Sequence, residues 1–194
     1  MTDTEKAKML RGDPYIAGDA ELVEERRRAR RLLHRINVEM PLSTPGDYAE
    51  VLRELLPNAT PPIWIQPPFH CDYGTNIRLG EGVFLNFNCV VLDCTTVTIG
   101  ARTQIGPNVH VYAADHPLDF GARAAAVEFA RPVSIGEDCW IGGSVVICPG
   151  VTVGDRCVIG AGAVVTKDIP DDALAVGNPA RVIRTIDRDR TDTV

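Results

Sequence analysis

A period of six residues runs through most of the chain between residues 79 and 165. Aliphatic residues occupy one phase of this repeat at twelve positions, and glycine directly follows seven of them. The twelve are Leu79, Leu85, Val91, Ile99, Ile105, Val111, Ile135, Ile141, Ile147, Val153, Ile159 and Val165. Small or β-branched residues, such as Val83, Cys89 and Thr103, recur four positions after an aliphatic residue.

Neither a helix, with about 3.6 residues per turn, nor a strand, with a side-chain period of about two, produces a period of six. A solenoid does, because one short strand and one corner together take six residues, and each turn stacks on the turn before it. We expect the aliphatic side chains to point into the tube. We expect glycine to follow them because it turns the chain at the least steric cost.

Residues 1–57 lack the repeat and predict a helical cap. Residues 20–37 place apolar side chains at helical spacing, and residues 45–56 carry proline and aspartate in their first turn, as helix starts prefer. The apolar positions of the first helix are Leu22, Val23, Ala29, Leu32, Leu33 and Ile36. Five prolines between residues 57 and 69 exclude a helix there. We therefore predict a cap over 1–57, a solenoid over 58–184 and a tail over 185–194.

The composition argues against a nucleic-acid partner and against a membrane span. Hydrophobic residues make up 45% of the sequence and the net charge is −6, which favours a globular protein without a nucleic-acid partner. No run approaches the roughly 18 apolar residues of a membrane span, and the segment MTDTEKAKML lacks the apolar core of a secretory signal. We expect a cytoplasmic protein. The arginines of residues 24–31 share their segment with Glu21, Glu24 and Glu25, which favours a solvated helix face over a nucleic-acid site.

Six cysteines are present, but no CxxC pair of the usual zinc spacing occurs. Cys89, Cys139 and Cys157 fall four positions after an aliphatic residue, where a small buried side chain is expected. Cys139 and Cys157 could lie on neighbouring strands about 4.8 Å apart, a distance that would tolerate a disulfide. We predict reduced packing residues instead.

The repeat has one long break, between Val111 and Ile135, where 24 residues stand in place of six. We expect a long loop at about 117–134, with His116 of the segment VYAADHP at its root. Long loops on repeat scaffolds usually serve binding or catalysis, although residue type alone allows a surface histidine. Neutral imidazole, with an ordinary pKa of about 6.5, is suited to take a proton at neutral pH. Only His110 and His116 lie among the repeats, so we predict no metal site.

The segment IGEDCWIGGSVVICPGVTVGDRCVIGAGAVVTKDIPDDALAVGNPARVIR, residues 135–184, resembles the hexapeptide-repeat acyltransferases. These proteins fold as left-handed parallel β-helices with three hexapeptides per coil, which implies coils over 79–96, 99–116, 135–152 and 153–170. Residues 71–94 and 108–117, and EKAKMLRGDPYIAGDAEL near the amino terminus, are similar to the sugar O-acetyltransferases of the maltose and galactoside group.

The resemblance implies a direct transfer of acetyl from acetyl-CoA to a sugar hydroxyl. In this group the histidine of the His-Pro dipeptide is the catalytic base, here His116. Asn86 would hold the acceptor or the transition state, and backbone N–H groups around Gly143 and Ser144 would donate to the carbonyl oxygen. Family members are trimers with sites between subunits, which implies a homotrimer.

Three cations gather near the end of the repeat and predict an anion site. Lys167 is the only lysine after residue 8, and Arg181 and Arg184 follow the last coil. By resemblance this site holds the phosphates of coenzyme A. The residues implied for the coenzyme are Gly143, Ser144, Ala161, Thr166, Lys167, Arg181 and Arg184, with Trp140 beside the groove and pointing outward.

The acceptor residues are Asp72, Asp93 and, in the cap, Asp19, because carboxylates accept hydrogen bonds from sugar hydroxyls. Galactoside enzymes carry an aspartate where this chain has Cys94, which favours a maltose- or glucose-type acceptor. Three alternatives stay open: an acetyltransferase for chloramphenicol- or streptogramin-type drugs, a non-catalytic β-helix that serves as an interaction module, and a covalent cysteine route.

Overall fold

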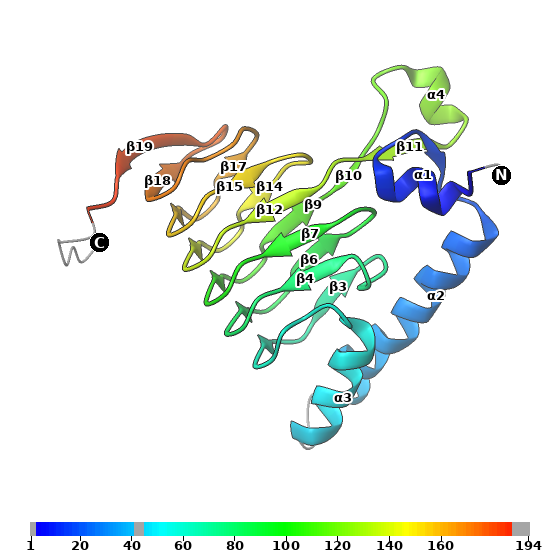
Figure 1. The fold of residues 1–194 in the computed structure, drawn as a ribbon, viewed down its shortest axis with the longest axis horizontal. Coiled ribbons are helices and arrows are strands. Elements are labelled where there is room, and N and C mark those ends of the chain that lie inside the picture. Colours follow the sequence, from blue (N-terminus) through cyan, green and yellow to red (C-terminus); the bar gives the residue numbers. More distant parts are fainter. Residues whose placement is uncertain (1–2, 41–44, 188–194) are drawn as a thin grey trace.

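The six-residue repeat folds into short strands that stack in three parallel sheets around a common interior (Figure 1). The computed structural model describes residues 3–40 and 45–187. The four-stranded sheet holds β4 (Ile77–Leu79), β7 (Val97–Ile99), β12 (Val133–Ile135) and β15 (Thr152–Val153). The five-stranded sheet holds β3 (Phe69–Cys71), β6 (Cys89–Leu92), β9 (His110–Tyr112), β14 (Val146–Ile147) and β17 (Val164–Val165).

The third, seven-stranded sheet runs the full length of the tube. It holds β2 (Trp64–Ile65), β5 (Phe84–Leu85), β8 (Gln104–Ile105), β13 (Trp140–Ile141), β16 (Val158–Ile159), β18 (Ala173–Val176) and β19 (Arg181–Thr185). The last strand, β19, is antiparallel to β18, whereas the other six are parallel. The predicted fold class, a mainly β, left-handed parallel β-helix with an amino-terminal helical cap, is confirmed.

All twelve aliphatic residues of the repeat are at most 2% exposed and fill the interior. The tube extends one turn further toward the amino terminus than the six-residue repeat in the sequence indicates. Ile65 pairs in register with Leu85, Cys71 with Val91, and Ala59 bridges Leu79. The tube therefore begins inside the proline-rich segment.

Within each turn the chain passes from the four-stranded to the seven-stranded sheet, then to the five-stranded sheet, and back. We call these three corners the first, second and third edges. The left-handed backbone conformation falls three positions after the interior residue, for example at Asn88, Asn108 and Ser144. The glycine one position after the interior residue serves a different purpose. A Cβ on Gly100 would lie 2.5 Å from the carbonyl carbon of Gly136 in the next turn. Close approach between turns, rather than the conformational freedom we predicted, requires these glycines.

The cysteines are packing residues, as predicted. All six are free thiols, and Cys89, Cys139 and Cys157 are at most 2% exposed. Each of these three donates its S–H to a backbone carbonyl of the next turn, those of Gly106, Gly154 and Pro170.

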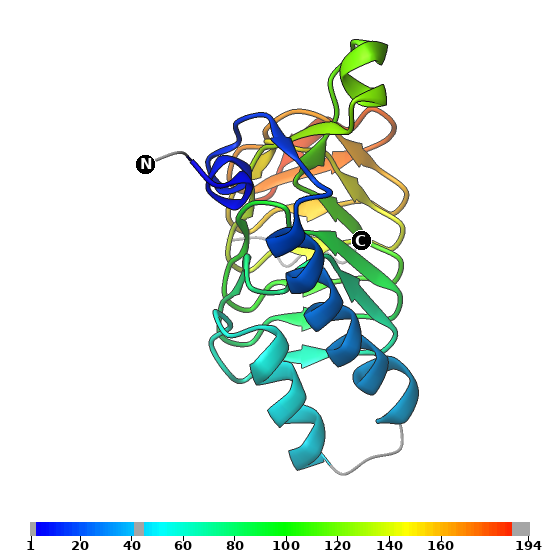
Figure 2. The same cartoon turned by 90° about the vertical axis from the view of Figure 1, so that its right-hand side faces the viewer.

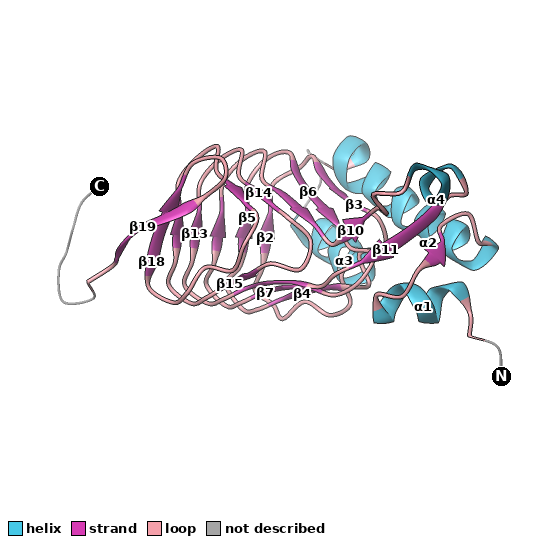
Figure 3. Cartoon of the chain, turned by 90° about the horizontal axis from the view of Figure 1, so that it is seen from above, coloured by secondary structure: helices cyan, strands magenta, loops and turns pink. Residues whose placement is uncertain are grey.

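Helices close the amino-terminal end of the tube (Figure 3). The cap comprises α1 (Glu5–Arg11), the short strand β1 (Tyr15–Ile16), α2 (Ala20–His34), the π-helix η1 (Arg35–Glu39) and α3 (Pro45–Leu55). Both predicted helices form. Apolar residues of α2 and α3, such as Leu33 and Leu55, join the interior cluster of the tube. Of the predicted tail over 185–194, residues 188–194 lie outside the described part of the chain.

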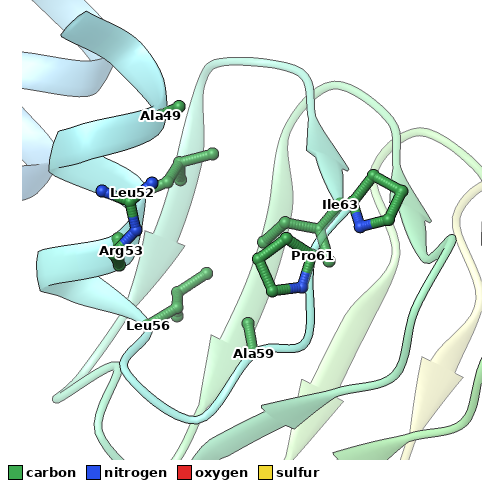
Figure 4. A pocket seen from close by; sticks show the side chains of 8 residues that line it. Ala49, Leu52, Arg53, Leu56, Ala59, Pro61 and Ile63 are labelled. Carbon is green, nitrogen blue, oxygen red and sulfur yellow. The ribbon is translucent and has the colours of Figure 1, made fainter. Parts of the chain in front are cut away.

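A cavity of about 240 Å³ separates α3 from the first turn (Figure 4). Apolar side chains line most of it, including Leu52, Leu56 and Ile63, and Arg53 is its one charged lining residue. It contains no group that could move a proton at neutral pH, and His116 is not among its lining residues. The predicted catalytic base therefore lies outside this cavity.

Candidate active site

The break in the repeat folds into a hairpin rather than a structureless loop. β10 (Ala114–Asp115) pairs antiparallel with β11 (Val127–Ala130), and α4 (Phe120–Ala124) lies between them. Figure 1 shows the hairpin leaving the third edge of the tube, close to α1. His116 stands directly after β10, where its backbone N–H donates to Oδ1 of Asp115 at 2.9 Å. The hairpin therefore holds this histidine beside the tube.

The cap contacts the hairpin through β1, on the side of β11 that faces away from β10. β1 pairs antiparallel with β11, so that Tyr15 stands opposite Glu128. The Tyr15 hydroxyl donates to Oε2 of Glu128 at 2.9 Å. Tyr15 is 1% exposed, and burial raises the pKa of its hydroxyl far above the ordinary value. The hydroxyl is therefore a fixed donor that orients the Glu128 carboxylate.

A cavity of about 290 Å³ opens where the cap, the hairpin and the third edge meet. Its lining comes from all three parts. The residues are Tyr15, Ala17, Arg26 and Arg30 from the cap, Asp72, Tyr73, Leu92 and Cys94 from the tube, and Ala114, His116 and Glu128 from the hairpin. The cavity thus places an imidazole among two carboxylates and two guanidinium groups.

Arg26 braces the cap side of this cavity. It donates to the Tyr73 hydroxyl and to the Ala17 carbonyl, each at 2.6 Å, and its guanidinium stacks over the Tyr73 ring at 5.7 Å. These contacts tie α2 to the third edge. Arg26 makes no ion pair among the described residues, so its charge is available to the cavity.

The carboxyl group of Asp72, predicted to contact the acceptor, does face this cavity. Burial raises its pKa, while the Cys94 thiol, which donates to Oδ2 of Asp72 at 3.6 Å, and the nearby Arg26 lower it. Burial also raises the pKa of the Cys94 thiol to about 12. Cys94 is therefore a neutral donor at neutral pH and not a nucleophile, which removes support from a covalent route at this position.

The carboxyl group of Asp93 lies behind the cavity wall. It is 0% exposed and does not line the cavity. Its Oδ1 accepts the backbone N–H groups of Asp72 and Tyr73 at 3.0 and 2.9 Å. Asp93 fixes the backbone of the corner that carries Asp72. Asp93 can therefore influence the binding of an acceptor only indirectly, by positioning Asp72.

Asp19, the remaining predicted acceptor residue, caps the start of α2 and accepts the Glu21 N–H at 3.0 Å. It does not line the cavity either; Ala17, two positions earlier, does.

Asn86 lies on the second edge, between β5 and β6, whereas His116 lies on the third. Its Oδ1 accepts the N–H of Phe87 at 2.7 Å. Within one chain the two predicted catalytic residues therefore occupy different edges of the tube. Gly143 and Ser144 share the edge of Asn86. The Ser144 N–H already donates to the Pro107 carbonyl at 2.8 Å, which leaves Gly143 as the better candidate for a donor to a ligand.

The residues predicted for the coenzyme also divide between two edges. Ala161 lies on the second edge with Gly143, whereas Thr166 and Lys167 lie on the third with His116. Trp140 is 52% exposed on the outer face of the seven-stranded sheet, pointing outward as predicted. Arg181 and Arg184 lie on β19 at the end of that sheet.

Sequence reasoning missed Tyr15, Arg26, Arg30 and Glu128. The alternation in VEFA could have predicted β11, because apolar residues two apart indicate a strand. Arg26 and Arg30 stand four apart on a helix, a spacing that places them on one face. Nothing local in the sequence indicates that this face meets the hairpin.

A parallel β-helix with a histidine beside a polar cavity is typical of acyltransferases of the hexapeptide type. Two family models match: the maltose acetyltransferase hexapeptide capping motif over residues 8–60, and the hexapeptide repeat of succinyl-transferase over residues 132–167. Nodulation protein L of Rhizobium meliloti is 50% identical over 186 residues, which cover 94% of this chain and 99% of that protein.

Two solved structures are similar over almost their whole length. A maltose O-acetyltransferase from Clostridium difficile is 43% identical, with a TM-score of 0.92, covering 97% of this chain and 100% of that one. A hexapeptide-repeat acetyltransferase from Vibrio cholerae, solved with acetyl-CoA, is 39% identical, with a TM-score of 0.87 and coverage of 95% and 100%. The chain belongs to the hexapeptide-repeat acetyltransferases, in the sugar O-acetyltransferase group, and is an acyltransferase.

Across residues 3–40 and 45–187, no helix is both long and apolar enough to cross a membrane. The same residues contain no group of three or more histidine, cysteine, aspartate or glutamate side chains arranged to hold a metal ion.

Proposed function

We propose that the protein transfers an acetyl group from acetyl-CoA directly to a hydroxyl of a maltose- or glucose-type sugar, with His116 as the general base. One observation carries the proposal: His116 lines the same cavity as the carboxylates of Asp72 and Glu128. Carboxylates accept hydrogen bonds from sugar hydroxyls and fix the ring, while the imidazole takes the proton from one of them.

The acceptor hydroxyl is a weak nucleophile at neutral pH. As its oxygen attacks the thioester carbonyl carbon, His116 takes its proton, and a tetrahedral oxyanion forms. When that intermediate collapses, the carbon–sulfur bond breaks and the coenzyme A thiolate leaves, taking up the proton from the imidazolium. Base catalysis of this kind typically contributes about 10²–10⁴ in rate. The Gly143 N–H is suited to stabilise the oxyanion.

The division of the predicted residues between two edges supports a homotrimer. In a three-fold assembly, the second edge of one copy, with Asn86 and Gly143, can face the third edge of a neighbour, with His116 and Lys167. The outer side of the seven-stranded sheet and the adjoining second edge also expose large apolar side chains. Trp64, Phe87 and Trp140 are each at least 50% exposed, as surfaces that bind another molecule often are.

Acetyl-CoA then lies in the groove between two copies. Its phosphates suit the cations Lys167, Arg181 and Arg184, and Thr166, Ala161 and Ser144 would line the groove. Cytoplasmic residence stays a prediction.

Steady-state acetyl transfer to glucose and maltose tests the base. His116→Ala should lose at least about a hundredfold in kcat and keep the thermal shift caused by coenzyme A. His110→Ala is the matched control, because His110 lies on β9, bonds to Tyr112 and does not line the cavity. If His116→Ala retains more than a tenth of the wild-type rate, the base is assigned wrongly. Chloramphenicol belongs in the acceptor panel, since its acetylation in preference to sugars would favour the drug-modifying alternative.

Mixing two inactive variants tests the shared site. Asn86→Ala and His116→Ala should be inactive alone. After subunit exchange they should recover up to about a quarter of wild-type activity, because a site needs an intact residue from each of two randomly combined copies. No recovery, despite verified exchange, would mean that one copy supplies both residues or that Asn86 is not required.

A further inference from the structure

The second half of α2 and its extension η1 carry charged side chains of positive sign only, up to Val38. Between residues 26 and 38 the sequence has six arginines and one histidine but no aspartate or glutamate. The carboxylates that precede them are already engaged. Lys6 pairs with Glu21 and Glu25, and Glu24 pairs with Arg27 and Arg31 at 3.6 and 3.3 Å. The balance of charges that favoured a plain solvated helix face therefore holds only for the first turns of α2.

Four of these side chains are exposed next to one another: Arg30, Arg31, His34 and Arg35, which we call the α2 basic cluster. They line a shallow depression of about 460 Å³ together with Glu39. Glu39 lies 3.5 Å from His34. Arg30 and Arg35 form no ion pair within the described ranges, 3–40 and 45–187. The depression therefore offers an anion two guanidinium groups, those of Arg30 and Arg35, that form no ion pair there.

The depression adjoins the cavity that holds His116, because Arg30 lines both. Arg26, Arg30 and His34 stand four residues apart and so follow one face of the helix. At about 1.5 Å per residue, the row is about 12 Å long, and its half from Arg30 to His34 extends beyond the cavity. Figure 2 shows α2 descending as one helix from the hairpin along the first turns of the tube. A ligand longer than one sugar could therefore leave the cavity along α2.

We propose that the acceptor is an acidic oligosaccharide. The sugar to be acetylated fills the cavity beside His116, and a carboxylate on a neighbouring sugar binds the α2 basic cluster. This inference rests on the proposed function. Arginine suits the task, since its planar guanidinium donates two parallel hydrogen bonds to one carboxylate and keeps its charge at every physiological pH. The net charge of −6 makes most of the protein surface unattractive to an anion. The acidic sugar should therefore bind at the α2 basic cluster, and this contact orients the acceptor in the cavity.

The test compares two acceptors that differ in one group: cellobiose, and the same disaccharide with its non-reducing glucose oxidised to glucuronate. At low salt, the wild-type protein should show a KM for the acidic disaccharide about fivefold lower, as expected for one exposed charge-assisted contact. The difference should shrink in about 0.5 M sodium chloride, where screening is strong.

Arg35→Gln and Arg31→Gln should abolish the preference without changing kcat or KM for cellobiose. Arg53→Gln, on the neighbouring helix α3, is the matched control and should keep the preference, because Arg53 is exposed but lies outside both depressions. Equal KM values for the two acceptors in the wild-type protein would overturn the inference. So would a preference that survives in Arg35→Gln and Arg31→Gln, or one lost equally in Arg53→Gln.

Binding separates this inference from the proposed function. If neither disaccharide is acetylated, the thermal shift decides the inference, while the rates with glucose and maltose decide the proposed function. At matched ionic strength the acidic disaccharide should stabilise the wild-type protein more than cellobiose does, and Arg35→Gln should remove the difference. The absence of any difference in the wild-type protein would show that the cluster does not recognise an acidic sugar.

Discussion

Arg131 and Asp115 bridge the two arms of the hairpin that carries His116, with Nη2 of the arginine 2.5 Å from Oδ2 of the aspartate. The other carboxylate oxygen of Asp115 accepts the His116 N–H. The backbone supports the same link, since the Arg131 N–H donates to the Ala113 carbonyl at 2.9 Å. Asp115 thus connects an exposed ion pair to the backbone of the proposed base.

Arg131→Ala should lower kcat about tenfold and change the melting temperature little. Exposed ion pairs contribute only about 0.2–1 kcal/mol to stability, whereas small displacements of a catalytic group cost much more in rate. Kinetics at saturating substrates measure the first effect and thermal denaturation the second.

Arg102→Ala is the control for that variant. Arg102 pairs with Glu137 and Asp138 on the first edge and is similarly exposed. It should leave kcat unchanged. Equal activity in the two variants would show that the Arg131–Asp115 pair does not position His116.

The repeat made the tube predictable because every interior position imposes the same demand on the sequence. Leu85, Ile105 and Ile141 each fill the same place in successive turns, so one pattern predicts them all. The first turn escaped the pattern for a physical reason. Its interior positions hold Ala59 and Cys71 in place of large aliphatic residues, and only Ile65 continues the pattern.

The site was predictable only in part. The insertion that interrupts the period drew attention to His116, and the family resemblance implied its role as the base. Arg26 and Arg30 were not, because their place beside the hairpin depends on the pairing of β1 with β11, residues more than a hundred positions apart. The separation of Asn86 from His116 likewise follows from the order of the sheets around the tube and not from any local spacing.

Asp93 should make the stability of the protein depend on pH. Burial is the largest cause that raises the pKa of Asp93 from 3.8 to about 7, while the N–H groups it accepts lower it. Because the folded-state pKa is above the unfolded one, the folded state binds more protons between these values. The stabilisation is fully present below about pH 4 and is lost as the pH rises through about 7.

From pH 5 to pH 8 this group should remove about 2–3 kcal/mol from the free energy of unfolding. Asp93→Asn abolishes the titration and should flatten the pH profile by that amount, measured by denaturant unfolding at fixed protein concentration. Parallel profiles for the variant and the wild-type protein would refute the assignment.

Gly100→Ala should destabilise the tube by about 1–3 kcal/mol, the usual cost of crowding a packed interior. Its new Cβ would lie 2.5 Å from the backbone of Gly136, which cannot move without shifting a turn. Gly18→Ala is the matched control, since a Cβ there meets nothing within 4 Å. Denaturant unfolding of both variants should show a loss only for Gly100→Ala. Similar stability of the two would mean that adjacent turns can separate at this edge.

Lys167→Gln should raise the KM for acetyl-CoA about three- to tenfold and leave the KM for the sugar unchanged. Lys167 is exposed on the third edge, and the neighbouring Asp168 is occupied, accepting the Thr152 N–H at 2.7 Å. A phosphate of the coenzyme is therefore a suitable partner for the ammonium group, and removing one exposed contact costs about 1 kcal/mol.

The difference in KM between Lys167→Gln and the wild-type protein should fade as salt is added, because mobile ions screen the attraction. Arg78→Gln is the control, since Arg78 is exposed on β4, on the outer face of the four-stranded sheet. If the two variants have the same KM for acetyl-CoA, Lys167 does not contact the coenzyme.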